Sequence, residues 1–357
     1  MDEGRIEPER LVATLRGRDS PTAPQLAAAV DRWRRPPRIQ VAGRARAGKT
    51  TVQRALALIS AEETAPVDEP GRDAPLLDAD LVLYVLGGTL YPADCAALGA
   101  AAQRTLVAEC GAASADTRSD EHEDRRAVRS VDIPVDTRSA DRILLVLNKA
   151  DAIGTRWSDA VAAADRYAAE TGLSTFPVMA TLAANTRSGI LTGADLAVLR
   201  RHTEQSDPAF TLAEERFTSP AFGPDTAERA TLIDRWTLPG IAYAHTALRH
   251  QPELPPRRLL QILHAASGID PLHHELHRRY EQLTVTRNAE FLDALAYLAA
   301  RADSDAPLRA DSGPDHLLSD RDLIERYLHG AEERSPADRP PAAAPHRAAM
   351  TAASGNG

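Results

Sequence analysis

Hydrophobic and polar positions follow two patterns along this chain. Up to about residue 180, short continuous apolar runs alternate with longer segments in which apolar residues recur at helical spacing. The runs predict strands at 38–42, 81–86, 142–147 and 176–180, with a further strand candidate at 63–67, and helices at 48–60, 92–110 and 158–170. Strands that are apolar throughout are typical of a parallel sheet covered by helices on both faces. We therefore expect an α/β fold.

Beyond residue 190 the strand pattern stops and only helical spacing remains. Residues 5–16 and 24–35 also have helical spacing. Two segments are polar or rich in Pro and Ala without periodicity, and we expect both to be disordered. The expected organisation is N-terminal helices at 1–36, an α/β domain with a mainly parallel sheet at 37–190, a disordered insertion at 112–140, a C-terminal α-helical domain at 191–332 and a disordered tail at 333–357.

Composition restricts which partners and which cellular compartment we expect for this protein. The net charge is −9 and no basic stripe is concentrated in the sequence, which argues against a nucleic-acid partner. The longest apolar runs fall far short of the ~20 residues that a membrane span needs. The N-terminus is acidic and polar, and the two cysteines have no metal or redox spacing. These features predict a cytoplasmic protein without a membrane span.

A glycine-rich loop stands between the first strand and the helix that follows it. Residues 43–50 read GRARAGKT and fit G-x-x-x-x-G-K-[ST] in the strand–loop–helix context that this phosphate-binding motif requires. The glycines let backbone N–H groups surround phosphate, the lysine reaches the β- and γ-phosphates, and the threonine hydroxyl binds Mg²⁺. The residues predicted to contact nucleotide here are Gly43, Ala47, Gly48, Lys49, Thr50 and Thr51.

A second motif ends the strand at 142–147. Asn148, Lys149 and Asp151 resemble the N-K-x-D motif with which P-loop GTPases recognise guanine. The resemblance implies that Asp151 accepts hydrogen bonds from the ring N–H and the exocyclic amine, a pair of donors that adenine lacks. It implies that Asn148 ties the base loop to the phosphate loop and that Lys149 covers the base. An ATP-using P-loop kinase is the alternative, and it would make Asp151 incidental.

The use of lysine supports both motifs. Among 42 basic residues only two are lysines, Lys49 and Lys149, and one falls in each motif. Arg and Lys are not interchangeable at a tight phosphate site, because the flat guanidinium is larger than the compact ammonium. A chain that uses Arg almost everywhere else has Lys at these two positions, which favours a chemical reason for them.

The GTPase motifs that sense the γ-phosphate are less complete in this sequence. Asp68 and Gly71 resemble the D-x-x-G motif, so we expect Asp68 to bind Mg²⁺ and take part in catalysis and Gly71 to lie at the γ-phosphate. A plain Pro-Gly turn is the alternative. Arg72 follows, where Ras-like enzymes have a catalytic Gln. Residues 51–67 are too few for a helix, a normal switch I loop and a further strand.

Two further residues are candidates by resemblance. Arg46, the fourth residue of the phosphate loop, occupies the place of an internal arginine finger in large guanylate-binding GTPases, which would stabilise charge on the transferred phosphoryl group. An exposed arginine without a role is the alternative. Ala180 lies where the fifth GTPase motif is expected, so its backbone N–H would point at the guanine carbonyl. A plain strand end is the alternative for this position.

Taken together, these stretches resemble actinobacterial dynamin-like GTPases of the isoniazid-inducible type. The similar segments are the phosphate loop with "EETAP", "ADLVLYVLGGTLYPADCAAL", "RWTLPGIAYA" and "SGIDPLHHELHRRY". The resemblance implies a P-loop GTPase domain on a helical bundle, GTP and Mg²⁺ as ligands, hydrolysis of GTP to GDP, homo- or heterodimerisation with another GTPase, and peripheral membrane association. The shortened switch I favours the alternative of a hydrolysis-deficient GTP-binding regulatory or scaffold partner.

Overall fold

The computed structural model describes residues 7–113, 141–189, 191–205, 208–302 and 319–332. The tail expected at 333–357 lies outside these residues. So does the insertion expected at 112–140, apart from residues 112 and 113, which end a helix. The chain divides into two units, Arg38–Arg279 and the pair of segments Met1–Pro37 and Tyr280–Gly357.

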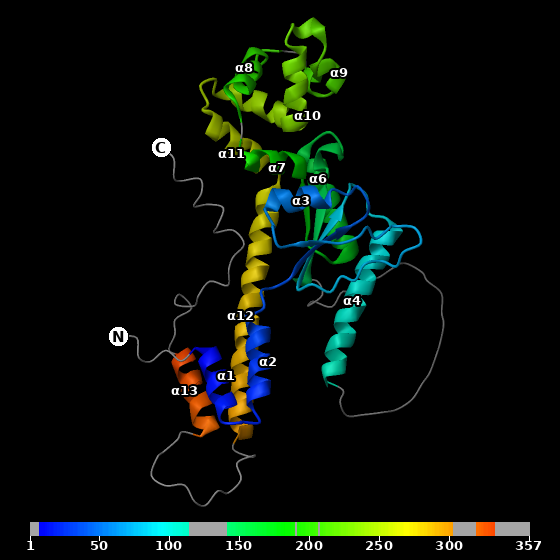
Figure 1. Ribbon diagram of the computed structural model, residues 1–357. Coiled ribbons are helices and arrows are strands. Elements are labelled where there is room, and N and C mark those ends of the chain that lie inside the picture. The colour runs from blue at the N-terminus through cyan, green and yellow to red at the C-terminus, as the bar shows by residue number, and fades with distance from the viewer. Residues whose placement is uncertain (1–6, 114–140, 190, 206–207, 303–318, 333–357) are drawn as a thin grey trace, which may run out of the picture. The chain divides into compact units, whose positions relative to one another are not determined.

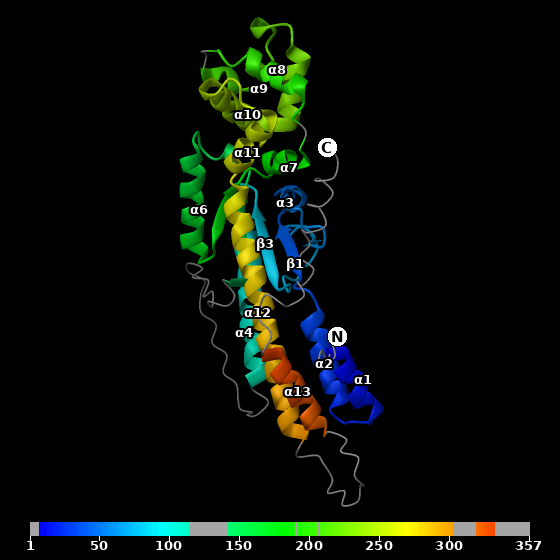
Figure 2. The same ribbon diagram turned by 90° about the vertical axis from the view of Figure 1, so that its left-hand side faces the viewer.

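The larger unit is built on a five-stranded parallel sheet (Figures 1 and 2). The strand order is β2-β1-β3-β4-β5, and each neighbouring pair is parallel. All residues of β1, β3 and β4 are buried, as a sheet covered on both faces requires. The strands are β1 (Ile39–Gly43), β2 (Glu62–Glu63), β3 (Leu81–Leu86), β4 (Ile143–Asn148) and β5 (Thr175–Val178). The expected α/β class is confirmed.

The strand expected at 63–67 differs in the structure. β2 covers only Glu62–Glu63 and pairs with β1, with Glu63 opposite Val41. The chain then continues beside β1, since the N–H of Thr64 donates to the Val41 carbonyl at 3.0 Å. Pro66 follows and has no N–H to donate, which interrupts the ladder. The strand is therefore shorter than its sequence pattern predicts.

Helices pack against the sheet. α4 (Pro92–Ala113) and α6 (Trp157–Thr171) share a core with β3 and β4. α3 (Lys49–Leu56) contacts β1 and α7 (Ala180–Ser188). Because all five strands are parallel, the loops after β1, β4 and β5 leave the same edge of the sheet, where α/β proteins commonly bind ligands.

The helices between residues 193 and 266 share a core with α7 and belong to the same unit as the sheet. They include α8 (Gly193–Arg201), α9 (Glu214–Phe217), α10 (Thr226–His250) and α11 (Pro256–Ala266). One core joins Met179 and Leu182 to Trp236 of α10 and Leu259 of α11. The domain boundary expected at 190/191 therefore falls within a continuous core.

A buried polar cluster holds the connection between α8 and α10. Arg229 is fully buried and donates to backbone carbonyls in the segment 217–223. Asp225 accepts from His202 at 2.9 Å and pairs with Arg229 at 3.2 Å, so the buried charges are compensated. Burial lowers the pKa of neighbouring His245 to about 4, which leaves that ring neutral at neutral pH. The contacts of Arg229, Asp225 and His202 thus have a structural explanation within the fold.

The second unit is a small helical assembly. It contains α1 (Pro8–Gly17), α2 (Ala23–Arg34), α13 (Asp320–Glu332) and the later part of α12 (Ile269–Ala302). Leucines from α1, α2 and α12 form its core, and Trp33 stacks on Phe291 with ring centroids 4.9 Å apart. The N-terminal helices lie close to their expected ranges. Among the described residues, no helix combines the length and apolarity needed to cross a membrane.

Candidate functional site

The loop between β1 and α3 approaches two other segments so closely that it requires glycine. Gly43 has φ +143°, and a Cβ there would lie 2.3 Å from the carbonyl oxygen of Val85 on β3. Gly48 has φ +96°, and a Cβ there would lie 2.2 Å from Nδ2 of Asn148. Gly43 is thus required by backbone conformation and by space, whereas Gly48 is required chiefly by its backbone conformation.

Lys49 begins α3 and is almost fully buried, with 7% of its surface exposed. Its Nζ lies 3.4 Å from the Gly43 carbonyl and 3.3 Å from the Arg44 carbonyl, so the ammonium is held beside the loop. The first N–H groups of a helix have no partner within the helix and carry its positive dipole end. A buried ammonium and a helix N-terminus together provide an environment suited to phosphate.

Asn148 joins the glycine-rich loop to two distant parts of the chain. Its Nδ2 donates to the carbonyl of Ala47 at 2.9 Å, and its Oδ1 accepts from the N–H of Ala180 at 3.2 Å. Lys149, in the left-handed region at φ +58°, donates from Nζ to the carbonyl of Arg46 at 3.0 Å. Residues about a hundred positions apart therefore meet through specific polar contacts at the carboxyl edge of the sheet.

Two candidate residues beside this junction have different surroundings. The N–H of Ala180 was expected to point at a guanine carbonyl, but the structure gives it Asn148 as its partner. The reason is that Ala180 is the first residue of α7, so its N–H has no acceptor within the helix. Asp151 lies in a 3-10 turn, Ala150–Ala152, directly after Lys149 and is exposed. Its carboxylate is accessible to a ligand.

Thr50 has a partner that no sequence motif indicates. Its Oγ1 donates to Oε2 of Glu63 at 2.7 Å, whereas Asp68 was expected to accompany it in binding Mg²⁺. Glu63 reaches this place because β2 pairs with β1 in a register that sets it opposite Val41. The only signal in the sequence was an acidic residue in a strand candidate beside the loop, and no motif singles it out.

Asp68 instead contacts the glycine-rich loop itself. Its Oδ1 accepts from the N–H of Ala45 at 2.8 Å, and its Oδ2 lies 3.9 Å from Nη1 of Arg44. Gly71 lies in a turn closed by the N–H of Arg72 and the carbonyl of residue 69, at φ +77° and exposed. The D-x-x-G segment thus meets the loop through its aspartate and forms a turn at its glycine.

Arg44, to which the sequence gave no role, links the loop to the segment after β3. Its Nε lies 3.5 Å from Oδ2 of Asp94, and its guanidinium lies 3.6 Å from the ring centre of Tyr91. Asp94 is 1% exposed and also accepts from the hydroxyl of Tyr84 at 2.8 Å. Burial raises the pKa of the Asp94 carboxyl above its ordinary value, and Arg44 opposes that shift. Arg44 is therefore a structural partner of this carboxyl.

The protein provides only a few oxygen ligands for a magnesium ion at this site. The described residues contain no group of three or more His, Cys, Asp or Glu side chains able to hold a metal. Thr50 and Glu63 present a hydroxyl and a carboxylate oxygen 2.7 Å apart. Mg²⁺ prefers such hard oxygen ligands and is commonly held by one or two carboxylates together with substrate phosphates and water. The donor set fits an ion that a nucleotide brings with it.

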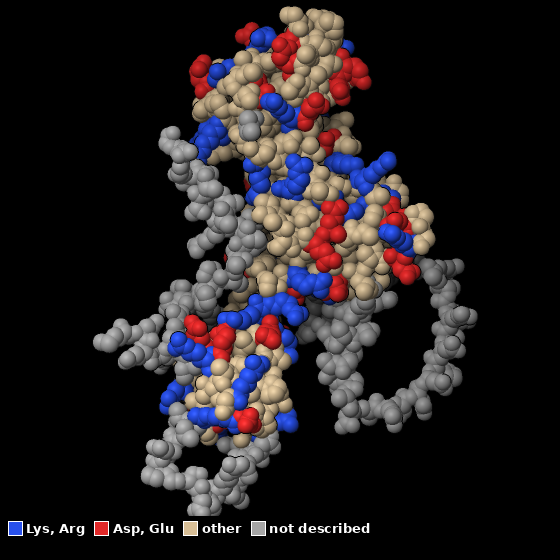
Figure 3. All heavy atoms as spheres, viewed as in Figure 1, with Lys and Arg blue, Asp and Glu red and all other residues tan. Residues whose placement is uncertain are grey.

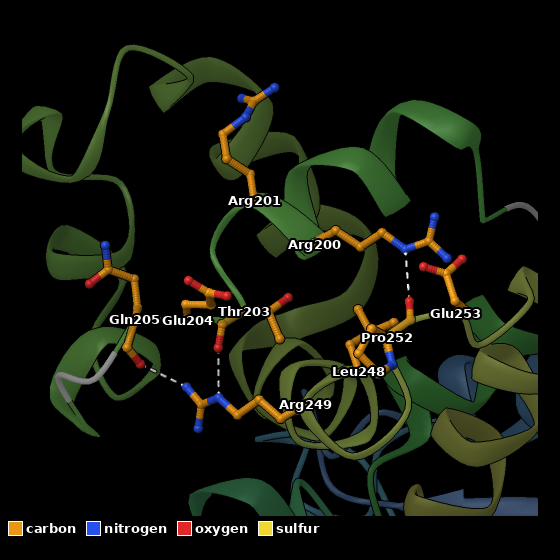
Figure 4. A pocket seen from close by; sticks show the side chains of 9 residues that line it. All are labelled: Arg200, Arg201, Thr203, Glu204, Gln205, Leu248, Arg249, Pro252 and Glu253. Carbon is orange, nitrogen blue, oxygen red and sulfur yellow. Dashed lines mark hydrogen bonds between the residues drawn. The ribbon is translucent and has the colours of Figure 1, made fainter.

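A cavity of about 620 Å³ lies elsewhere, between the ends of α8 and α10 (Figure 4). Arg249 donates to the carbonyls of Thr203 and Gln205 at 2.7 and 2.8 Å, and Arg200 donates to that of Pro252 at 3.2 Å. Figure 4 shows these guanidinium groups pointing in different directions. They satisfy carbonyls near the helix ends and do not converge on a common point, so this cavity is a weaker candidate than the loop.

Acidic and basic side chains are interspersed on the face shown in Figure 3.

Comparison of the chain with protein-family models, with curated proteins and with solved structures found no match. The function therefore has to be inferred from the motifs and from the geometry at the carboxyl edge of the sheet.

Proposed function

We propose that this protein binds guanine nucleotides and hydrolyses GTP to GDP and phosphate with Mg²⁺, as a member of the dynamin-like GTPase group. The observation that supports this most is the junction at Asn148. Its side chain connects the glycine-rich loop at Ala47 with the start of α7 at Ala180. A phosphate-binding loop and a base-reading segment are useful together only if they are held at a fixed separation, and Asn148 provides that connection.

The residues of the loop would bind the phosphates. The backbone from Gly43 to Gly48 and the first turn of α3 provide N–H groups, and Lys49 provides a compact positive charge. Thr50 and Glu63 would hold Mg²⁺ by the oxygen atoms that now contact each other. When bound, the ion neutralises charge on the phosphate oxygens.

Guanine recognition is the part of the proposal most open to a direct test. Asn in place of Asp151 presents an amide group, which matches the carbonyl that xanthine has where guanine has its amine. We expect Asp151→Asn to weaken GTP binding by about a hundredfold and to strengthen xanthosine triphosphate binding, because a mismatched buried donor pair loses its hydrogen bonds. Isothermal titration of wild type and variant with both nucleotides measures the exchange.

Asp165→Asn is the matched control, because it removes the same charge from an exposed position on α6. It should bind GTP as the wild type does. If Asp151→Asn gains nothing for xanthosine triphosphate, guanine recognition by this residue is excluded. Equal affinity of the wild type for ATP and GTP would favour an ATP-using P-loop enzyme.

Hydrolysis is tested at Arg46. This residue is exposed and has φ +60°, and its carbonyl accepts from Lys149. Arginine fingers contribute on the order of 10³-fold or more to GTP hydrolysis. We expect Arg46→Ala to lower the single-turnover rate by at least about tenfold without weakening GTP binding in proportion. Arg54→Ala, at an exposed position on α3, should leave the rate unchanged.

A GTP-binding regulatory or scaffold protein without hydrolysis is the second candidate. Only residues 57–61 join α3 to β2, and Arg72, which pairs with Glu69 at 3.1 Å, stands where a water-positioning Gln is expected. Under this alternative, the single-turnover rates of wild type and Arg46→Ala would both equal the uncatalysed rate. Either function is compatible with a cytoplasmic protein that pairs with a second copy or with another GTPase, as the resemblance implies.

A further inference from the structure

The N–H group of Ala45 has a negatively charged partner within the protein. Oδ1 of Asp68 lies 2.8 Å from this nitrogen, and Oδ2 lies 3.9 Å from Nη1 of Arg44. A carboxylate that accepts from a backbone N–H of a phosphate loop occupies the kind of contact that a phosphate oxygen makes.

The position of Lys49 indicates which phosphate this contact concerns. Its Nζ lies against the carbonyls of Gly43 and Arg44, immediately before Ala45 in the chain. The lysine of this motif reaches the β- and γ-phosphates. The N–H of Ala45 therefore lies at the end of the loop that serves the later phosphates, and a triphosphate would bring a further negative group toward Asp68.

The backbone delivers Asp68 to this position. After β2, the N–H of Val67 donates to the carbonyl of Gly43 at 3.3 Å, and this contact sets the next residue beside the loop. Beyond Asp68 the chain enters the exposed turn that contains Gly71. Asp68 thus stands between a segment held against β1 and a segment on the surface, so it can leave Ala45 without disrupting the sheet.

We infer that Asp68 determines the preference between guanosine di- and triphosphate, because its carboxylate competes with the terminal phosphate for the N–H of Ala45. This inference rests on the proposed nucleotide site and differs from the Mg²⁺-binding role expected from the D-x-x-G pattern. Thr50 and Glu63 carry the metal-binding role instead. The Asp68 carboxylate does not oppose binding of the diphosphate, which lacks the terminal phosphate. The triphosphate has to displace this negatively charged carboxylate from the N–H of Ala45.

The experiment compares wild type, Asp68→Asn, Asp68→Ala and Asp73→Asn in the full chain. Asp68→Asn keeps an oxygen for the Ala45 N–H but removes the charge, and Asp73→Asn removes a charge from an exposed position nearby. Dissociation constants are measured for GDP, a non-hydrolysable GTP analogue, the matching ATP analogue and tripolyphosphate, each with Mg²⁺ and with EDTA. Circular dichroism verifies that each variant is folded.

We expect both Asp68 variants to bind the GTP analogue on the order of tenfold more tightly, since neighbouring like charges repel by at least this factor. GDP affinity should not change, and Asp73→Asn should behave as the wild type. If the Asp68 variants lose affinity for the GTP analogue only in the measurements with Mg²⁺, and not in those with EDTA, then Asp68 binds the metal and the inference is overturned. Unchanged triphosphate affinity would also overturn it.

The failure of guanine specificity would give a different result. One such outcome is that the GTP analogue, the ATP analogue and tripolyphosphate bind the wild type equally well and all bind the Asp68 variants more tightly. In that case the proposed base recognition is wrong, while the role of Asp68 stands. If no variant and no wild-type sample binds any of the polyphosphates, both the phosphate site and the role of Asp68 are excluded.

Discussion

Lys49→Arg should weaken guanine-nucleotide binding by at least about a hundredfold, to the same extent as Lys49→Met, because charge-assisted contacts in a tight site are lost in both. Lys49 is 7% exposed, and its ammonium lies between two loop carbonyls. A guanidinium is planar and larger, so it cannot occupy this position without moving the loop. Conserving the positive charge should therefore not preserve binding.

Titration with fluorescent GDP and a GTP analogue measures the effect on Lys49 variants. Arg54→Lys is the reverse exchange at an exposed position on the same helix, and it should leave both affinities unchanged. Near-wild-type binding by Lys49→Arg would contradict the steric explanation. It would also remove the significance of the two lysines in a chain that otherwise uses arginine.

Gly43→Ala should lower the free energy of unfolding by about 3–5 kcal/mol, as the sum of an unfavourable backbone conformation and a collision in the core. The new Cβ would lie 2.3 Å from the carbonyl oxygen of Val85, which is part of the β1–β3 ladder and cannot rotate away. Urea unfolding followed by circular dichroism measures the change.

Gly71→Ala separates the two causes. Gly71 also has positive φ, at +77°, but a Cβ there would meet no atom within 4 Å. Its substitution should cost only about 1–2 kcal/mol, the expense of the left-handed conformation alone. Equal losses in the two variants would show that close approach of β1 to β3 has no energetic role.

The strongest sequence predictions concern β1, β3 and β4. β3 is hydrophobic throughout, β4 is apolar up to Asn148, and β1 includes one polar residue, the buried Gln40, because parallel strands covered on both faces leave little room for polar side chains. The glycine-rich loop was also predictable, since the strand, the two glycines and the helix follow each other directly in the chain. Local patterns of this kind depend on neighbouring residues and need no knowledge of distant segments.

Contacts between segments far apart in the chain were not predictable in the same way. The motifs suggested that Asn148 approaches the loop, but only the fold shows that its Oδ1 takes the N–H of Ala180. Glu63 was missed because its contact with Thr50 depends on the pairing register of a two-residue strand. No local pattern encodes a register of that length.

The sequence by itself therefore determined the type of sheet, the position of the glycine-rich loop and the two lysines that mark the candidate nucleotide site. Only the tertiary structure decided that Glu63 accompanies Thr50, that Asp68 bonds to Ala45, and that α8, α10 and α11 share a core with the end of the sheet. The physical reason is that apolar periodicity and turn chemistry act over a few residues, whereas strand register and helix packing depend on the whole folded chain.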